Sequence, residues 1–314
     1  MSAGAAAAGG SGTARRMWQA LETLHMTVYF APEPRDAYRR AGLRGGWMGY
    51  FASRAAAMGP VPAEVVMATF YNFHPRMVRR AIPDAWGFAP PERVLAARYE
   101  GADAALRRLL GPWAEGAEVA EAAALARQAM EGRDPSGRPL FAAHAALPWP
   151  DEPRLALWHG ATLYREFRGD GHVACLLADA VDGCEAHVLA AGAGQLPGSV
   201  LREYRGWSDE EWSAAAARLR GRGWVDPEGS LTAAGRDARD AREAGTDDLA
   251  AAPWDHWVPT PAPASWPCST APSAWSWRAA ASPSPTRSAC RRPPPDGPPA
   301  RGPECGRPAG CWPG

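Results

Sequence analysis

Large apolar side chains stop abruptly near Trp257, and this break limits what the chain can fold into. Residues 259–314 contain no Leu, Ile, Val, Phe, Tyr or Met, and they hold 15 of the 32 prolines. Such a segment cannot bury enough apolar surface to offset an ordering entropy of about 1–2 kcal/mol per residue. We therefore predict a disordered tail over residues 258–314 and a folded body before it.

The origin of this tail is a separate hypothesis. All 34 basic residues are Arg, and the chain has one Ile and one Asn, which is typical of a GC-rich gene. Residues 258–292, back-translated with GC-rich codons and read one frame over, give an amphipathic helix and an apolar run. The tail is then a frameshift product, natural or from sequencing, and the nucleotide sequence of the gene tests this.

The body consists of helical patterns separated by glycine and proline. Apolar residues recur at helical spacing over residues 15–25, 34–43, 45–59, 62–73, 90–111 and 117–130. The proline-rich segment 135–153 indicates a linker around one short helix. We accordingly predict a disordered start over residues 1–14, a helical domain over 15–134 and a second domain over 154–257.

In the second domain we expect several short helices with marked starts. Gly169 is predicted to end the first of them, and Asp170 is the predicted N-cap of the next. Asp182 is the predicted N-cap of a further helix. Ser208 with Glu211 three residues later forms a predicted capping box.

The stretch RLRGRGWVDPEGSLTAAGRDARDAREAGTDDLA, residues 218–250, resembles a known pattern. It is similar to the recognition-helix end, β-wing and following helix of MarR-type winged-helix proteins. The matching features are Leu219, Gly223 with Trp224, a turn at 227–229, and Leu231–Thr232 followed by Gly235. The resemblance implies two short strands around the turn and a helix that Thr232 caps.

A longer resemblance covers roughly residues 16–257. The stretches HMTVYFAPE, GPVPAEVVMATFYNFHPRMV, LFAAHAALPWPDEP, LWHGATLYREFRGDGHVACLLADAVDGCEAHVL and RGWSDEEW are similar to the SalK-like helix-turn-helix family. That family usually reads Arg-Glu-His-Arg-Gly-Asp-Gly-His, and this chain has Phe167 in place of the first His. The resemblance implies a mainly α fold: a helical N-terminal domain, then a winged-helix, MarR-like C-terminal domain with a small β-wing. Winged-helix regulators of this kind are usually homodimers.

The fold analogy makes the helix over residues 208–222 a DNA reader, but its charge opposes this role. Its first turn carries Asp209, Glu210 and Glu211, and residues 199–257 hold 8 Arg against 12 Asp and Glu, a formal charge of −4. Phosphate contacts dominate DNA affinity and need a basic footprint, so DNA is a doubtful partner. The candidate DNA contacts are Arg218, Arg220, Arg222 and Arg236, and the alternative is that they lie on a solvated helix face.

A candidate ligand site lies where Arg165, Glu166, Arg168, Asp170 and His172 follow one another. A helix start at Asp170 would favour an anion through its free N–H groups and dipole. A carboxylate or phosphate on a small ligand therefore fits this segment. The alternative is structural: Asp170 caps a helix, Arg165 pairs with Glu166 or Asp170, and His172 is a core histidine.

The first half of the body adds His25, Tyr29 and His74, which are polar residues among apolar neighbours. His25 and Tyr29 are four residues apart and share a face if the helix persists that far. Together with Asn72 and His172 we expect them to line one pocket between the two halves. Such a pocket would orient a small ligand or perform acid–base chemistry.

Missing motifs exclude several classes of protein. The body has no H-x-x-x-H or C-x-x-C spacing, so we expect no metal site. It also lacks the glycine-rich dinucleotide fingerprint and the Walker lysine, so we expect no cofactor. Without a G-x-S-x-G sequence, we expect no nucleophile elbow of an α/β-hydrolase. No run of about 18 apolar residues exists, and the start lacks the apolar core of a signal peptide. With Cys175 and Cys184 the only body cysteines, we expect a cytoplasmic protein that does not bind a membrane.

Three functions from different classes remain open. The first is a ligand-responsive winged-helix transcriptional regulator that binds a small molecule. The second is a metabolite-tailoring enzyme on the same scaffold, with His25, His74, Glu166, Asp170 or His172 as acid–base groups. The third is a binding protein without catalysis. Fold alone does not decide among them, so whether the protein is an enzyme stays open.

Overall fold

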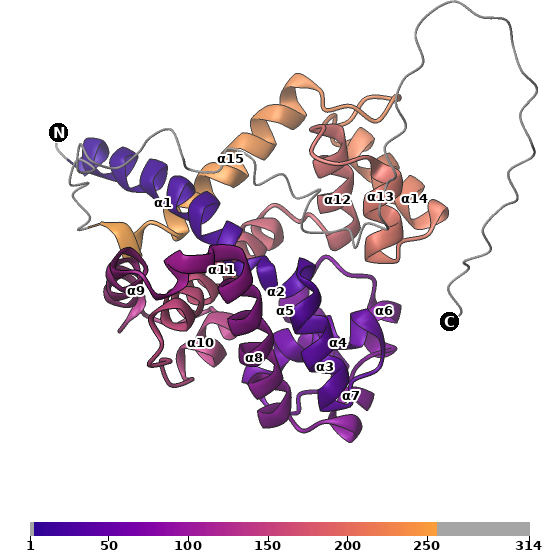
Figure 1. The fold of residues 1–314 in the computed structure, drawn as a ribbon. Helices are drawn as coiled ribbons and strands as arrows, with labels where there is room; N and C mark the ends of the chain where they lie inside the picture. The colour runs from indigo at the N-terminus through magenta and orange to yellow at the C-terminus, as the bar shows by residue number, and fades with distance from the viewer. Residues whose placement is uncertain (1–2, 256–314) are drawn as a thin grey trace, which may run out of the picture. The chain divides into compact units, whose positions relative to one another are not determined.

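The computed structural model describes residues 3–255, with side chains from residue 11, as a set of packed helices (Figure 1). The helices of the first half are α1 (Ala3–His25), α2 (Thr27–Phe30), α3 (Pro32–Ala41), α4 (Gly45–Ala55), α5 (Ala63–Phe70), α6 (Pro75–Arg79), α7 (Asp84–Phe88), α8 (Pro91–Leu110), α9 (Ala117–Met130) and α10 (Pro139–Ala145). Those of the second half are α11 (Pro153–Ala178), α12 (Gly183–Gly192), α13 (Gly198–Arg205), α14 (Asp209–Gly221) and α15 (Ala233–Leu249). Short 3₁₀ helices are η1 (Ala56–Met58), η2 (Gly111–Glu115) and η3 (Ala252–Trp254).

The described residues, 3–255, all fall in one compact unit. The division into domains at residues 135–153 stays a prediction, and α10 with its buried Leu140 and Phe141 lies in that segment. The predicted disorder of the tail over 258–314 lies outside the described residues. At the other end, α1 begins at Ala3 rather than near Arg15, because the early residues are largely alanine, the strongest helix former.

Helix α11 packs against helices from both ends of the described chain. Helices α1, α9, α10 and α15 all contact it, and 16 of its 26 residues are buried. The prediction that Gly169 ends this helix is wrong, since α11 continues through Gly169 and Asp170 to Ala178. A glycine inside a helix costs about 1 kcal/mol, which burial of so long a helix exceeds. Glycine also makes room here: a Cβ on Gly171 would lie 3.1 Å from Arg138 and 3.2 Å from Leu249.

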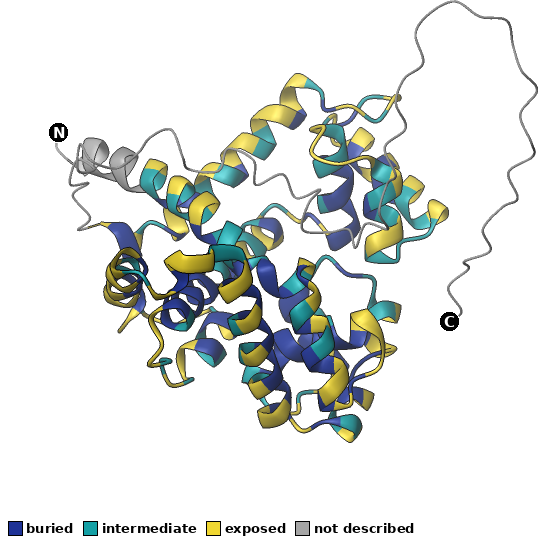
Figure 2. Ribbon diagram, viewed as in Figure 1, coloured by how far each residue is buried: buried dark blue, intermediate teal, exposed yellow. Residues whose placement is uncertain are grey.

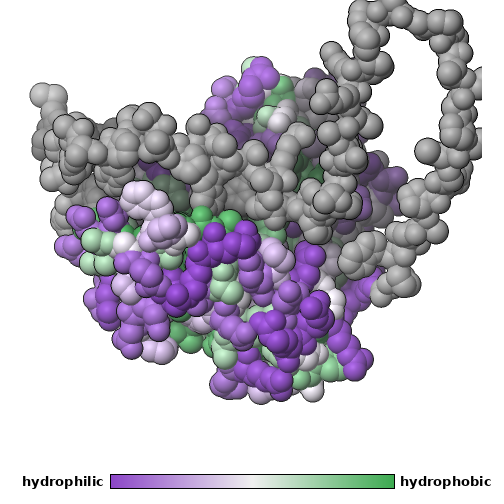
Figure 3. Space-filling view, in the orientation of Figure 1, coloured by the Kyte–Doolittle hydropathy of each residue, from purple (hydrophilic) through white to green (hydrophobic). Residues whose placement is uncertain are grey.

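Two apolar clusters form the core of the body around α11. One joins α3, α4, α5 and α8 and includes Phe51, Val66 and Ile82, each fully buried. The other joins α1, α9 and α11 and includes Tyr164 and Trp254. Figure 2 shows the buried faces of these helices turned toward one another and the exposed faces turned outward. Figure 3 shows the corresponding outer face over α3 and α8 as mostly hydrophilic.

A third cluster holds α12 and α14 together with the end of α11. Leu176, Val188, Ala215 and Leu219 are all buried in it. The predicted caps are confirmed: Asp182 and Ser208 form capping boxes with Glu185 and Glu211, and the Thr232 side chain accepts from the Gly235 N–H. Side chains that cap a helix supply partners for its first N–H groups.

The predicted β-wing is absent from the described residues. Only an isolated antiparallel bridge between Val225 and Leu231 is found, with flanking hydrogen bonds from Asp226 N to Ser230 O and from Thr232 N to Trp224 O. The turn at Pro227–Gly229 is present, but α15 begins at once after Thr232. Too few residues are left on either side of the turn to extend the bridge into strands.

Candidate functional site

Glu166 on α11 is buried against two arginines. Arg54 from α4 donates to both of its carboxylate oxygens, at 2.9 and 2.8 Å, and Arg165 Nη1 donates to Oε2 at 2.8 Å. Glu166 is 0% exposed. Burial would raise the pKa of Glu166, but Arg165 and Arg54 outweigh it and hold the pKa well below its usual range. The carboxylate therefore stays ionised and is unsuited to proton transfer near neutral pH.

Arg168 points to the other side of α11, toward α15. Its guanidinium donates to Asp247 at 2.9 Å and to Glu243 at 3.2 Å, and it lies 4.3 Å from the Trp18 ring centroid. Arg15 on α1 also donates to Asp247, at 2.6 Å. These contacts join α1, α11 and α15. Arg165 and Arg168 thus contact different partners, Glu166 and Asp247, although both belong to the candidate ligand segment.

Asp170 does not cap the helix in which it lies. Its Oδ2 accepts from the backbone N–H of Phe141 at 3.0 Å, so it caps the start of α10 from the neighbouring helix. Burial raises the pKa of Asp170 to about 6, in spite of that hydrogen bond. Asp170 therefore caps a helix, as the structural alternative for this residue has it, although the helix that it caps is α10 and not its own.

His25 and Tyr29 face each other as predicted, across the short break between α1 and α2. Thr162 donates its hydroxyl to Trp158 O, so His25 Nδ1–H donates to Thr162 Oγ1 at 3.1 Å and Nε2 accepts from Tyr29 at 3.0 Å. Burial lowers the pKa of His25 well below its usual range. The imidazole ring is therefore neutral, and both of its nitrogens have hydrogen-bond partners within the protein.

His74 joins the first half of the body to α14. Its Nδ1 accepts from the Arg76 N–H at 3.0 Å, so its Nε2–H donates to Glu211 Oε1 at 2.8 Å. The backbone N–H of His74 donates to Arg205 O at 2.9 Å. Two residues earlier, Asn72 O accepts from His187 Nε2 at 3.1 Å and from Trp207 Nε1 at 3.2 Å. The segment 72–74 thus holds α12, α13 and α14 through four hydrogen bonds.

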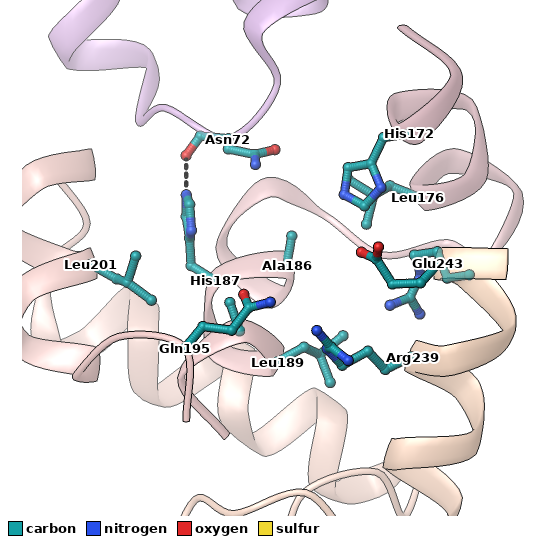
Figure 4. A pocket seen from close by; sticks show the side chains of 12 residues that line it. Asn72, His172, Leu176, Ala186, His187, Leu189, Gln195, Leu201, Arg239 and Glu243 are labelled. Carbon is teal, nitrogen blue, oxygen red and sulfur yellow. Dashed lines mark hydrogen bonds between the residues drawn. The ribbon is translucent and has the colours of Figure 1, made fainter. Parts of the chain in front are cut away.

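Two neighbouring cavities share Asn72 and His172 as wall residues. The larger has a volume of about 240 Å³ and is also lined by His187, Gln195, Arg239 and Glu243. Figure 4 shows Asn72 and His172 on one side of it, and Gln195 and Arg239 on the other. The smaller has a volume of about 120 Å³ and lies between α4, α11 and the end of α13.

His172 is the one predicted ligand residue that lines both cavities. Its Nδ1 lies 3.1 Å from Thr246 Oγ1, and burial lowers the pKa of His172. Arg165 lines the smaller cavity, whereas His25, Tyr29, His74, Glu166, Arg168 and Asp170 line neither. Of the candidate ligand residues, His172 and Arg165 thus line these cavities, and Asn72, which we also expected in the single pocket, lines both.

Sequence reasoning missed two arginines at the smaller cavity, Arg54 and Arg205. Arg54 carried a signal, because it is a single charge within the apolar run FASRAAAMG and such a charge must be paired if buried. Arg205, in REYRGW, carried none. Its position depends on how α13 meets the 72–74 segment, which no local pattern encodes.

Helices α13 and α14 are joined by the short turn 206–208. Gly206 adopts a left-handed conformation there, with φ of 78°, and a Cβ at that position would lie 2.6 Å from Met77. Two helices joined by a three- or four-residue turn containing glycine form a helix-turn-helix. The exposed face of α14 carries Glu210, Ser213, Ala214, Ala217 and Arg220.

Three of the four predicted DNA-binding arginines have partners inside the protein. Arg218 pairs with Asp182 and Glu185, and Arg236 donates to Leu231 O at 2.7 Å. Arg222 donates to the carbonyls of Asp179 and Ala180 and lies 3.6 Å from the Trp224 ring centroid. Arg220 alone among the four is exposed without a hydrogen bond or ion pair to the residues described here.

The arrangement of α13 and α14 defines a helix-turn-helix protein. A family model described as "Helix-turn-helix family" matches residues 14–266, and the chain belongs to this family. No curated protein and no solved structure matches the chain. The SalK-like and MarR-type assignments are finer than this match and stay predictions.

Two further findings concern membrane-spanning helices and metal sites in the described part of the chain. None of the helices in residues 3–255 has the length and apolar character to cross a membrane. Across the same residues, no three His, Cys, Asp or Glu side chains gather where they could hold a metal ion.

Proposed function

We propose that this protein is a ligand-responsive transcriptional regulator, in which a small molecule occupies the cavities beside Asn72 and His172. One observation carries the proposal: the 72–74 segment forms part of the cavity wall and also holds the helix-turn-helix. A ligand that contacts Asn72 or Phe73 therefore touches the same residues, or the immediate neighbours of the residues, that contact His187, Trp207 and Glu211.

The coupling needs only a difference in ligand affinity between two positions of the helix-turn-helix. Helix α13 contributes Leu201 to the larger cavity and Arg205 to the smaller one, and α12 contributes His187. A ligand in the cavities thus touches both the body and the helices whose placement it would change. A ligand bound on one side alone would have no such effect.

The expected output is DNA binding of modest, mainly electrostatic character. The exposed face of α14 offers Arg220 and Ser213 as hydrogen-bonding groups for base edges, whereas Glu210 would repel phosphates. The membership of the helix-turn-helix family supports DNA as the partner, and the acidic start of α14 argues for weak affinity.

The test is fluorescence anisotropy of the full chain with DNA from upstream of its own gene and with random DNA, at two salt concentrations. A regulator binds the upstream DNA more tightly, and log affinity falls with log salt by about 0.9 per phosphate contact. Arg220→Gln should weaken binding, whereas Arg39→Gln on α3 is the matched control. Equal binding to both DNAs, or no binding at all, would contradict the regulatory proposal.

The enzymatic alternative rests on His172. Of the five acid–base candidates it is the one that lines the cavities, where it lies near Glu243. Glu166 is held ionised by two arginines, and Asp170 caps α10. Turnover that disappears in a folded His172→Ala variant would favour this alternative over the regulator.

A further inference from the structure

Arg205 is a partly buried cation for which the described residues supply no counterion. Its Nε is buried and has no hydrogen-bond partner, and its guanidinium lies 4.4 Å from the Phe73 ring centroid. Burial, together with Arg54 and Arg165, lowers the pKa of Arg205. A buried polar atom without a hydrogen-bond partner is costly, so the Nε of Arg205 lacks an acceptor that an anion in the cavity would supply.

Two more arginines, Arg54 and Arg165, line the same small cavity. The carboxylates nearest to this group are Glu166, which both of these arginines contact, and Glu22, whose pKa is raised by burial. Even with Glu22 ionised, three arginines face two carboxylates, and one positive charge remains. The excess lies at Arg205, which forms no ion pair among residues 3–255.

We infer that the smaller cavity binds the oxyanion group of the ligand, a carboxylate or a phosphate, between Arg205 on α13 and the pair Arg54 and Arg165 on the body. This rests on the proposed function, because it names the chemical class of the ligand in the same cavities. A planar guanidinium matches both carboxylate and phosphate with two parallel hydrogen bonds.

The rest of the cavity wall indicates what the oxyanion is attached to. Tyr50, Phe70 and Phe73 line the space beside the arginines. Its volume of about 120 Å³ is smaller than the ~150 Å³ of a cavity that takes up benzene, but the adjoining cavity of about 240 Å³ shares Asn72 and His172 with it and adds space. A flat apolar body the size of one ring, with the oxyanion at one end, therefore fits. The larger cavity beyond Asn72 and His172 leaves room for polar substituents.

The same charges give the ligand its effect on the helix-turn-helix. Arg205 is the last residue of α13, whereas Arg54 and Arg165 belong to α4 and α11. Without an anion the three cations repel one another across the junction, and with an anion they are drawn together. The ligand thus acts as a counterion bridge between α13 and the body.

The test is binding of three probes to the full chain by calorimetry: benzoate, phenyl phosphate and neutral benzamide. At least one anion should bind more tightly than benzamide, and Arg205→Met should raise its Kd by about tenfold or more. Arg205→Lys should give an intermediate Kd, and Arg39→Gln, an exposed arginine on α3, should leave it within about twofold. Which anion binds more tightly tells a carboxylate from a phosphate ligand.

Folding controls the interpretation of Arg205→Met. Because the substitution removes a partly buried charge with an unpartnered Nε and keeps an apolar stem, its urea midpoint without ligand should equal or exceed that of the wild type. Equal anion affinity in wild type and Arg205→Met, or no preference for anions over benzamide, overturns the inference. A neutral ligand that still alters DNA binding would leave the proposed regulator standing without the oxyanion site.

Discussion

Replacing Glu166 by Gln tests the charge cluster on which the body is built. The substitution keeps the shape of the side chain but removes its charge, so Arg54 and Arg165 stay buried beside each other without their shared carboxylate. Glu166 accepts three hydrogen bonds from these arginines and is 0% exposed. Breaking a buried pair from one side costs about 3–5 kcal/mol.

Urea unfolding, followed by circular dichroism, measures this loss. With an m-value of about 1–3 kcal/mol/M, a loss of about 3–5 kcal/mol should lower the urea midpoint of Glu166→Gln by roughly 1–5 M. The control is Glu100→Gln, which breaks the surface pair of Arg40 and Glu100, with both side chains 59% exposed. That change should cost about 0–1 kcal/mol. Equal midpoints for Glu166→Gln and Glu100→Gln would refute the buried-charge account.

The pH dependence gives an independent check with a fixed sign. The folded pKa of Glu166 lies well below its usual 4.5, so its stabilisation is complete above the unfolded pKa and is lost as the pH falls toward the folded one. The difference between wild type and Glu166→Gln should therefore be full at pH 7 and narrow below pH 4.5. A difference that grows on acidification would contradict the assignment.

Three further predictions concern other sites. Burial raises the folded pKa of Asp170 to about 6, so the stability that this residue contributes is present below its unfolded pKa and is lost as the pH rises through 6. In urea unfolding, the free energy of unfolding of Asp170→Asn should therefore gain about 1–3 kcal/mol relative to wild type between pH 4 and pH 7. The same pH dependence of stability in both proteins would disprove this. A Cβ on Gly235 would lie 2.0 Å from Trp224 O, so Gly235→Ala should lose about 1–3 kcal/mol in thermal unfolding, while Gly221→Ala, with nothing within 4 Å, should be neutral or gain up to about 1 kcal/mol. His74→Phe removes the contact to Glu211, so amides of α13 and α14 should exchange hydrogen faster while those of α8 do not change; uniform exchange would argue against a separate hinge at residues 72–74.

Local signals in the sequence predicted the helices and their caps. Helix α9 occupies residues 117–130 as predicted, and Asp182, Ser208 and Thr232 cap where short polar side chains precede helical patterns. These features depend on a few neighbouring residues. The continuation of α11 through Gly169 does not, since the residues around Gly169 contact distant parts of the chain: Arg168 donates to Asp247 of α15, and Asp170 accepts from the Phe141 N–H of α10.

The candidate site was predictable only in part for the same reason. His172 and Arg165 line the cavities as polar residues in an apolar helix, which the sequence indicated. Arg205 reaches its place because Asn72 and His74 hold α13 and α14 against the body. Contacts between residues more than a hundred positions apart leave no periodic pattern in the sequence. The position of Arg205 at the smaller cavity could therefore not be predicted from the sequence.

Helix α15 connects the segment after the helix-turn-helix to the contacts with α1. Its 17 residues span about 25 Å, with Gly235 against the Trp224 backbone at one end and Asp247 in contact with Arg15 of α1 at the other. A tilt of about 10° at the first end displaces the second by about 4 Å, if the helix stays rigid over that length. A rotation of the helix-turn-helix that carried α15 with it would therefore move the end at which Asp247 contacts Arg15 of α1 and Arg168 of α11.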